Sequence, residues 1–251
     1  MPWRAVAVLL LGLLPMWPGQ EQPASNKSDS SKIWVGRHQE IEEYLRSAEC
    51  VSMTVFAKVY VSRCTFRPGG PVARMAWRPL RPGGHRGFRE NYKSEIAGYE
   101  LDKLLKMDMV PPTVERDLQG TVGAAQLWVE KVVDGNDPTL PDAEHRSHWE
   151  EQGVRMTMFD TLIGNRGRNR ANMLRDDAWN LMLVDHSRAF APGSELLHKL
   201  NRIDKEYWVK IEALTRRQLD AALRAWLDDG EIKAILDRRE AMRAEIKSLP
   251  R

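Results

Sequence analysis

The chain has 251 residues, of which 42% are hydrophobic, 29% are charged and nine are tryptophan. This apolar content excludes an intrinsically disordered protein and is enough for one or two lobes around a hydrophobic core. The formal net charge of +3 excludes a strong global field that would draw the whole molecule onto nucleic acid, so we expect no nucleic-acid partner. Basic residues are concentrated locally, around 63–93 and 166–175.

The N-terminal residues have the pattern of an export signal. A single early cation, Arg4, precedes an apolar run over 5–14, which is too short to cross a bilayer but suits the centre of a signal peptide. We predict a signal peptide over 1–19 and a polar, flexible tether over 20–32. The mature chain would then be secreted, periplasmic or in the secretory-pathway lumen, without a transmembrane span. A buried N-terminal helix is the alternative.

Residues 33–133 predict a small β-rich lobe with one long helix. Alternating and β-branched residues indicate strands, glycine-proline stretches indicate turns, and Pro111 and Pro112 end the long helix. In chain order we expect an amphipathic helix over 33–49, a strand over 51–62, a strand over 72–80, a helix over about 90–106 and a strand over 124–133.

Residues 134–251 predict a mainly helical lobe. A loop rich in Asp, Pro and Gly at 134–143 precedes it and places the boundary near 133–143. In chain order we expect a helix over about 144–163, a strand over 181–184 and helices over about 196–213, 215–228 and 230–248. The fold class is therefore α+β with two lobes.

Two cysteines, Cys50 and Cys64, lie on or near the first predicted strand. In an exported chain they could form a disulfide, which would stabilise the fold by roughly 3 kcal/mol in the chain-entropy model. Two free, buried thiols on neighbouring strands are an equal alternative.

Charged and polar side chains at the ends of these elements suggest phosphoryl transfer. Nucleotide phosphates need a cation on a rigid strand and a carboxylate on a neighbouring helix to hold it, and Arg78 and Glu95 are candidates. Metal ions need hard oxygen ligands, which Asn172 and Asp185 could supply. Taken singly, these residues could equally be a strand-end arginine, a solvated helix glutamate and a turn aspartate.

Five motifs together resemble a known family. They are MAWRPL (75–80), ENYKSEIAGYELDKLLK (90–106), LWVEKV (127–132), FDTLIGNRGRNRANML (159–174) and LMLVDHSRAF (181–190). The sequence over about 50–225 resembles the atypical kinases of the secretory pathway, of the Golgi casein-kinase and xylosyl-kinase type. More distantly it resembles the phosphatidylinositol kinases and the HipA-type kinases. The resemblance implies a bilobal protein-kinase-like fold that binds ATP with Mg²⁺ or Mn²⁺.

The resemblance also implies roles for individual residues in nucleotide binding. The family's strand lysine falls on Arg78, and its helix glutamate falls on Glu95. The hinge between the lobes, which holds the adenine, falls on Trp128, Val129 and Glu130. Arginine keeps the positive charge of the lysine but is larger, and its planar guanidinium could crowd the phosphates.

The catalytic loop departs from the family pattern at its centre. The loop reads Gly-Asn-x-Asp-Arg-His-x-x-Asn in the family, which places the catalytic aspartate on Gly167 and a metal ligand on Asn172. The metal-binding aspartate of the Asp-Phe-Gly-like motif falls on Asp185. A glycine cannot accept a proton, and general-base assistance commonly contributes about 10²–10⁴-fold, so turnover would be slow. We do not expect Asp160, about two helical turns earlier, to replace the missing carboxylate.

Three functions remain open at this point. The first is a kinase-like domain that binds ATP and metal, with weakened phosphotransfer to a hydroxyl of a protein, sugar or lipid. The second is a pseudokinase that acts as a regulatory or binding module through a protein partner. The third is an exported scaffold that binds acidic polymers. Arg166, Arg168 and Arg170 could draw in an acidic substrate, or could simply lie on a solvated loop.

Overall fold

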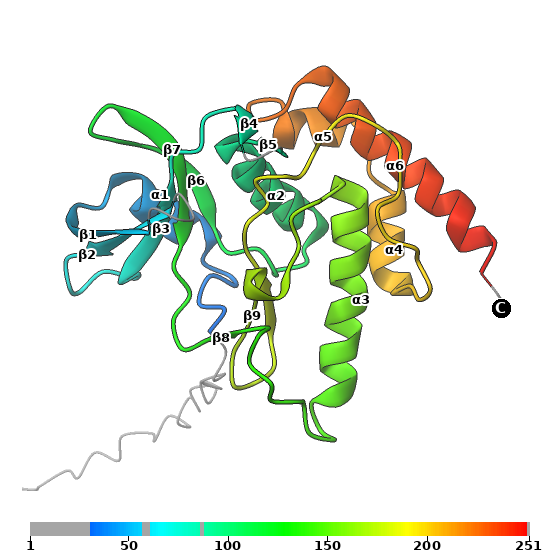
Figure 1. Cartoon of the computed structure of the whole chain (residues 1–251), viewed down its shortest axis with the longest axis horizontal. Helices are drawn as coiled ribbons and strands as arrows, with labels where there is room; N and C mark the ends of the chain where they lie inside the picture. The colour runs from blue at the N-terminus through cyan, green and yellow to red at the C-terminus, as the bar shows by residue number, and fades with distance from the viewer. Residues whose placement is uncertain (1–30, 57–60, 86–87, 250–251) are drawn as a thin grey trace, which may run out of the picture.

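The computed structural model describes residues 31–56, 61–85 and 88–249 (Figure 1). The predicted signal peptide over 1–19 and nearly all of the predicted tether lie outside the described residues. Within the part of the chain that the structure describes, no helix combines the length and the apolar character needed to cross a bilayer. The predicted α+β class is confirmed, since a sheet dominates the first half and helices the second.

The first half is built on a five-stranded sheet in the order β1-β2-β3-β7-β6, in which all neighbouring strands are antiparallel. The helices α1 (His38–Ser47) and α2 (Tyr92–Leu105) pack against β6 and β7. The strands are β1 (Cys50–Phe56), β2 (Val61–Phe66), β3 (Arg74–Arg78), β6 (Thr113–Leu118) and β7 (Thr121–Leu127). A separate hairpin is formed by β4 (Gly83–His85) and β5 (Phe88–Glu90).

The strands β1 and β2 are joined covalently. Cys50 and Cys64 form a disulfide with a Cα–Cα distance of 5.7 Å, which decides between the two alternatives left open by the sequence. On the inner face of the sheet, Phe66 and Met75 pack with Ile41 of α1 in a buried apolar cluster. Burial of one face of a sheet against an amphipathic helix is the main stabilising term of such a layer.

Helix α2 begins and ends at residues suited to those positions. The Asn91 side chain accepts a hydrogen bond from the backbone N–H of Lys93, which satisfies one of the free donors at the helix start. Lys106 has a left-handed conformation and ends the helix, since a left-handed residue cannot continue a right-handed helix. Most of the helix between these points is buried, so Glu95 is held in the interior.

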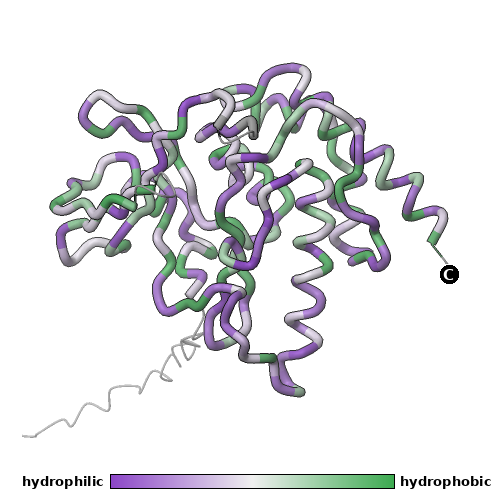
Figure 2. The backbone as a smooth tube through the Cα atoms, viewed as in Figure 1, coloured by the Kyte–Doolittle hydropathy of each residue, from purple (hydrophilic) through white to green (hydrophobic). Residues whose placement is uncertain are grey.

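The second half is helical, with a small sheet in the order β10-β9-β8 at its edge. Helices α5 and α6 begin with capping boxes, at Thr215 and Asp228, in which side chains satisfy the free N–H groups. Figure 2 shows hydrophobic and hydrophilic residues alternating along α6, as expected for a helix with one buried face. The elements are β8 (Val133–Asp134), α3 (Arg146–Ile163), the 3₁₀ turn η2 (Arg170–Asn172), β9 (Met173–Arg175), β10 (Leu181–Leu183), α4 (Lys205–Glu212), α5 (Arg216–Leu223) and α6 (Asp229–Lys247).

Several predicted elements are wrong in extent. The strand expected over 51–62 is two strands, β1 and β2, and β6 was not predicted at all. The strand expected over 124–133 is β7, which ends at Leu127. The helix expected over 196–213 begins only at 205, because the Asp204 side chain caps it by accepting from the N–H of Tyr207.

Candidate functional site

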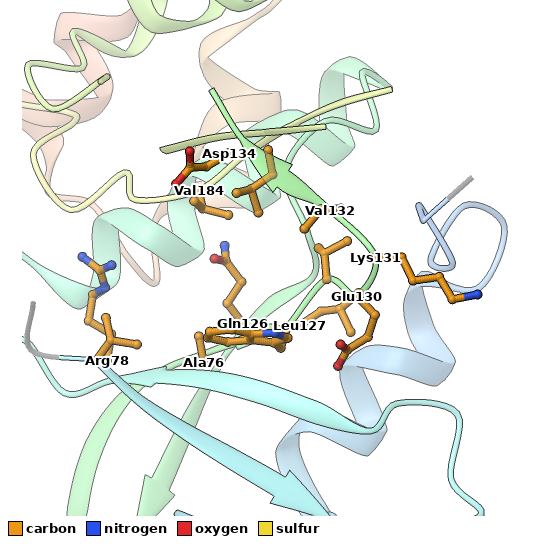
Figure 3. A pocket seen from close by; sticks show the side chains of 13 residues that line it. Ala76, Arg78, Gln126, Leu127, Glu130, Lys131, Val132, Asp134 and Val184 are labelled. Carbon is orange, nitrogen blue, oxygen red and sulfur yellow. The ribbon is translucent and has the colours of Figure 1, made fainter. Parts of the chain in front are cut away.

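A cavity of about 430 Å³ lies between the sheet and the second half of the chain. Figure 3 shows Arg78 at one end of this cavity, with Gln126 and Ala76 on one wall and Val184 and Asp134 on the opposite side. The three predicted hinge residues, Trp128, Val129 and Glu130, all line it. The remaining lining residues are Val61, Ala76, Arg78, Gln126, Leu127, Lys131, Val132, Asp134, Leu174 and Val184.

The hinge residues are held by contacts to the sheet. The Glu130 carboxylate forms an ion pair with Arg74 of β3, and the backbone N–H of Trp128 donates to the carbonyl of Arg74 at 3.2 Å. The Trp128 ring stacks on Phe56, with the Arg63 guanidinium over both rings. The segment after β7 is therefore positioned by β1, β2 and β3.

Three of the predicted site residues meet at the inner end of the cavity. Arg78 Nη1 donates to Asp185 Oδ1 at 2.8 Å, and Arg78 Nε lies 3.4 Å from Glu95 Oε1. Glu95 Oε2 accepts from the backbone N–H of His186 at 2.7 Å. Residues far apart in the sequence, from β3, α2 and the turn after β10, thus form one charged cluster.

A glycine in β7 allows the close packing that positions Arg78. An ideal Cβ on Gly123 of β7 would lie 2.7 Å from the carbonyl oxygen of Arg78 and from Cα of Pro79. Real Cβ atoms do not approach other atoms so closely, so only glycine lets β7 pack against the end of β3. This packing fixes the backbone from which the Arg78 side chain extends.

Burial and charge shift the pKa values of the cluster in opposite directions. Burial raises the pKa of Glu95 to about 7, although the Arg78 guanidinium opposes the shift. Burial would also raise the pKa of Asp185, but the charge of Arg78 and the hydrogen bond from Ser187 outweigh it and lower the pKa. Asp185 is therefore ionised at neutral pH, and Arg78 is its counter-ion.

Helix α2 is also tied to the segment after Asp185 by hydrogen bonds. Besides the contact between Glu95 and His186, the backbone N–H of Asn91 donates to the carbonyl of Ser187 at 3.0 Å. The Ser94 hydroxyl donates to the carbonyl of Ala189 at 3.4 Å. The carboxylate on the helix and the carboxylate after β10 are consequently held in a fixed relation.

The catalytic-loop segment is organised around Arg168. Its guanidinium forms two hydrogen bonds with the buried Asp160, at 2.8 and 3.0 Å. It also donates to the backbone carbonyls of Asn172 and Val184, at 2.9 and 2.7 Å. These two carbonyls belong to one predicted metal ligand and to the neighbour of the other, so Arg168 positions both. Asp160, which is 1% exposed, is fully engaged inside the loop and does not face the cavity.

Gly167 lies at the surface of this loop, beside Arg188. Its backbone N–H donates to Asn165 Oδ1 at 2.9 Å. A Cβ at this position would lie 3.5 Å from Cδ of Arg188, whose guanidinium is paired with Glu90 at 2.7 Å. The backbone of Gly167 is not in the left-handed region, but a Cβ would also lie 3.3 Å from Asn165 Oδ1, so a larger residue requires the Asn165 side chain to shift by a few tenths of an ångström.

The donor set near Asp185 fits a divalent cation only in part. Asn172 Nδ2 lies 3.5 Å from Asp185 Oδ2, while Oδ1 accepts from Arg78 and from the Ser187 hydroxyl. Among the described residues no group of three His, Cys, Asp or Glu side chains could hold a metal. Mg²⁺ is commonly bound by one or two carboxylates together with substrate phosphates. Asn172 and Asp185 therefore suit a cation that nucleotide phosphates also coordinate, provided that Arg78 releases Oδ1.

Comparisons with solved structures identify the fold. The Golgi casein kinase matches in two structures, at TM-scores of 0.62 and 0.63 and 13% identity, over 83% of this chain and 75% and 74% of that chain; the first was solved with Mn/ADP bound. The chain has a Fam20-like atypical kinase fold. A hydra Fam20 structure solved with sugar matches at a TM-score of 0.60 and 15% identity, over 82% of this chain and 87% of that one.

A bacterial kinase shares the Fam20-like fold. The Helicobacter pylori proinflammatory kinase CtkA matches at a TM-score of 0.56 and 11% identity, over 82% of this chain and 99% of that one. No protein-family model matches the sequence, and no curated protein matches it either. The family resemblance inferred from the motifs is confirmed at the level of the fold.

Sequence reasoning missed one buried ion pair near this site. The buried pair of Arg168 and Asp160 was hidden because Arg168 stands among similar arginines in a polar loop. The available signal was the spacing of eight residues between Asp160 and Arg168. Gly164, which ends the helix between them, lets the loop fold back so that the two side chains meet. The structure separates the three loop arginines: the Arg168 side chain is only 7% exposed, whereas Arg166 and Arg170 are exposed residues.

Proposed function

We propose that this chain binds an adenine nucleotide with Mg²⁺ or Mn²⁺ in the interlobe cavity and transfers its terminal phosphoryl group to a hydroxyl acceptor only slowly. The observation that supports this proposal is the cluster of Arg78, Glu95 and Asp185 at the inner end of the cavity. The Golgi casein kinase, which has the same fold, was solved with Mn/ADP bound.

In this proposal the parts of the cavity have different tasks. The apolar wall and the segment 128–130 take the adenine, and Arg78, oriented by Glu95, takes the phosphates. Asn172 and Asp185 hold the cation, which would neutralise charge on the phosphates. Without a carboxylate at Gly167 nothing accepts the proton of the attacking hydroxyl there, and this is why transfer would be slow.

The test is a thermal-shift titration of the full chain with ATP at millimolar concentration, with Mg²⁺, with Mn²⁺ and with a chelator. We expect a saturable rise in the unfolding midpoint that is largest with metal, and we expect Asp185→Asn to abolish the metal-dependent part. Asp177→Asn is the matched control, because Asp177 is an exposed aspartate beyond β9. An equal response in all three proteins would overturn the proposal.

A pseudokinase that acts through a protein partner is the second candidate, and Gly167 is the observation that favours it. It shares the nucleotide site but not the transfer step. The two candidates separate in a long single-turnover incubation with ATP and Mn²⁺. Phosphate transfer or release that Asp185→Asn abolishes supports slow transfer, and its absence supports the pseudokinase.

We also propose that the chain is exported, as the sequence predicts. The disulfide between Cys50 and Cys64 supports this, because disulfides persist mainly in oxidising compartments. Expression of the full chain in a secreting cell, followed by N-terminal sequencing of the medium, tests it. A mature protein that begins near residue 20 is the expected result, and retention of the uncleaved chain in the cytosol contradicts it.

A further inference from the structure

A second cavity, of about 400 Å³, lies on the helical half of the chain, away from the proposed nucleotide site. It lies between the end of α3, the segment over 191–197 and helix α6. Its lining residues are Gly164, Arg166, Ala191, Pro192, Gly193, Ser194, Glu195, Leu197 and Arg238. None of them lines the interlobe cavity.

Arg238 of α6 contributes a buried guanidinium to this cavity. The residue is 2% exposed, and its Nε donates to the carbonyl of Leu162 at 2.7 Å. Its Nη1 donates to the carbonyls of Ala191 and Gly193, at 3.0 and 2.8 Å. These contacts fix the position of the guanidinium, because they join it to the backbone at the end of α3 and at two points of the segment over 191–197.

One nitrogen of the Arg238 guanidinium lacks a hydrogen-bond acceptor among the described residues. Nη2 of Arg238 is buried and has no hydrogen-bond acceptor, and no carboxylate among the described residues lies within ion-pair distance. Burial lowers the pKa of Arg238 to about 10; the charge of Asp237 opposes this shift, and the charge of Arg166 adds to it. A buried, unpaired cation is costly unless an anion joins it.

Arg166 brings a second guanidinium to the cavity, and this one is accessible. Its side chain is 53% exposed and lies 3.7 Å from the Glu195 carboxylate, which is 86% exposed. An exposed pair at this distance is weak, so an anionic ligand could displace Glu195. The cavity then presents two positive charges, one fixed and buried and one flexible at its mouth.

We propose that this cavity binds a phosphoryl or sulfate group between Arg238 and Arg166. Two guanidinium groups match the charge of a dianion, and their N–H groups match its several acceptor oxygens. The group could be a free ion or could belong to a phosphorylated serine side chain. The site is independent of the nucleotide cavity and of the fate of phosphotransfer.

The experiment titrates the full chain, without nucleotide, with millimolar sodium sulfate against sodium chloride at equal ionic strength. We expect saturable binding of sulfate, measured by calorimetry and by the unfolding midpoint, at concentrations where general salt effects are small. Arg166→Gln should weaken the binding about tenfold, since it removes charge-assisted hydrogen bonds. Glu195→Gln should strengthen it roughly threefold, since it removes a competing carboxylate.

Arg170→Gln is the matched control, because Arg170 is an exposed arginine of the same loop that does not line the cavity. It should bind sulfate as the wild type does. A substitution of Arg238 is not a suitable test. It would also leave three backbone carbonyls without a donor, so a loss of stability could not be separated from a loss of binding.

A phosphoserine derivative with blocked termini, compared with the same unphosphorylated derivative, identifies the source of the group. Competition of the phosphorylated compound with sulfate supports a site for a modified side chain, and sulfate binding without such competition supports a site for the free ion. Equal weakening by Arg166→Gln and Arg170→Gln, or no sulfate binding beyond chloride, overturns the proposal.

Discussion

The inner end of the interlobe cavity and the catalytic-loop segment use ion pairs in different ways. Arg78 lines the cavity and Asp185 pairs with it there; their side chains are 19% and 30% exposed, so solvent reaches both. In the loop, Arg168 and Asp160 are 7% and 2% exposed, so their pair is closed to ligands. Arg78 and Asp185 can therefore exchange partners when a ligand binds. Arg168 and Asp160 can only stabilise the conformation of the loop.

This difference explains how the segment over 164–172 can keep its form without a side chain at position 167. Arg168, Asp160 and Asn165 connect the loop to the end of α3, and position 167 contributes no side chain to that network. The shape of the loop and the chemistry at its centre are therefore physically separable. Variants that alter one region should leave the other intact.

Gly167→Asp should have the largest effect, on rate. The backbone conformation admits a side chain there if Asn165 shifts slightly, and a carboxylate would supply a group able to accept the hydroxyl proton. We expect phosphate release from ATP with Mn²⁺ to rise by about 10²-fold or more. Gly167→Asn, of the same size but uncharged, is the control. If Gly167→Asp binds the nucleotide but releases phosphate no faster than wild type, position 167 is not where a general base is missing.

Asp160→Asn should have the largest effect on stability. It leaves the buried Arg168 guanidinium without a counter-ion, and breaking a buried pair in this way typically costs about 3–5 kcal/mol. Urea unfolding measures the loss. The exposed pair of Glu150 and Arg202 provides the control, since Glu150→Gln should cost less than about 1 kcal/mol. Equal losses in the two variants would contradict the structural role of the closed pair.

Glu95→Gln should change how stability depends on pH. The carboxyl of Glu95 ionises near 4.5 in the unfolded chain, whereas burial raises its pKa to about 7 in the folded protein. Folding therefore gains stability from the bound proton below 4.5, and this gain is lost as the pH rises through 7.

The variant lacks this titration, so its stability relative to wild type should increase across that range. The change should be on the order of 3 kcal/mol at most. Unfolding free energies measured from pH 4.5 to 8 test the prediction. Parallel profiles for the two proteins would show that Glu95 is ionised throughout.

Arg78→Lys should have the smallest effect. A lysine ammonium is a point charge and cannot span Glu95 and Asp185 as the guanidinium does. Asp185 should be freer to bind a cation, and we expect the affinity for ATP with Mn²⁺ to rise about threefold at a stability cost of about 1 kcal/mol. Arg67→Lys, which alters an exposed pair with Glu49 away from the cavity, is the control. Weaker metal-dependent binding in Arg78→Lys would show that the guanidinium assists the ligand.

The parts of the site that the sequence predicted are those with short, ordered motifs. Arg78, Glu95, Asn172 and Asp185 follow from their places at the ends of a strand, a helix, a turn and a second strand. The structure brings them together, while their roles toward nucleotide and metal remain predictions. Such motifs can be recognised in a sequence because each residue is positioned by the helix, strand or turn in which it lies.

Other features depend on contacts that no local pattern encodes. The strand β6 was missed because Thr113–Leu118 has charged residues at Glu115, Arg116 and Asp117, which weaken the strand pattern. Buried Arg116 donates to the carbonyls of Leu45 and Ala48 at the end of α1. These acceptors come from a distant part of the chain, and the same is true of the backbone carbonyls that Arg238 contacts.

Helix α2 and residues 186–189 are fastened together by hydrogen bonds, in which Asn91 and Ser94 donate and the Glu95 carboxyl accepts. An ideal Cβ on Gly98 would approach the His186 ring to 3.1 Å, so the two segments are also in direct contact. Swinging the helix outward would strand a buried carboxylate and expose an imidazole. A regulator that works by displacing this helix would therefore have to break these hydrogen bonds and separate Glu95 from His186.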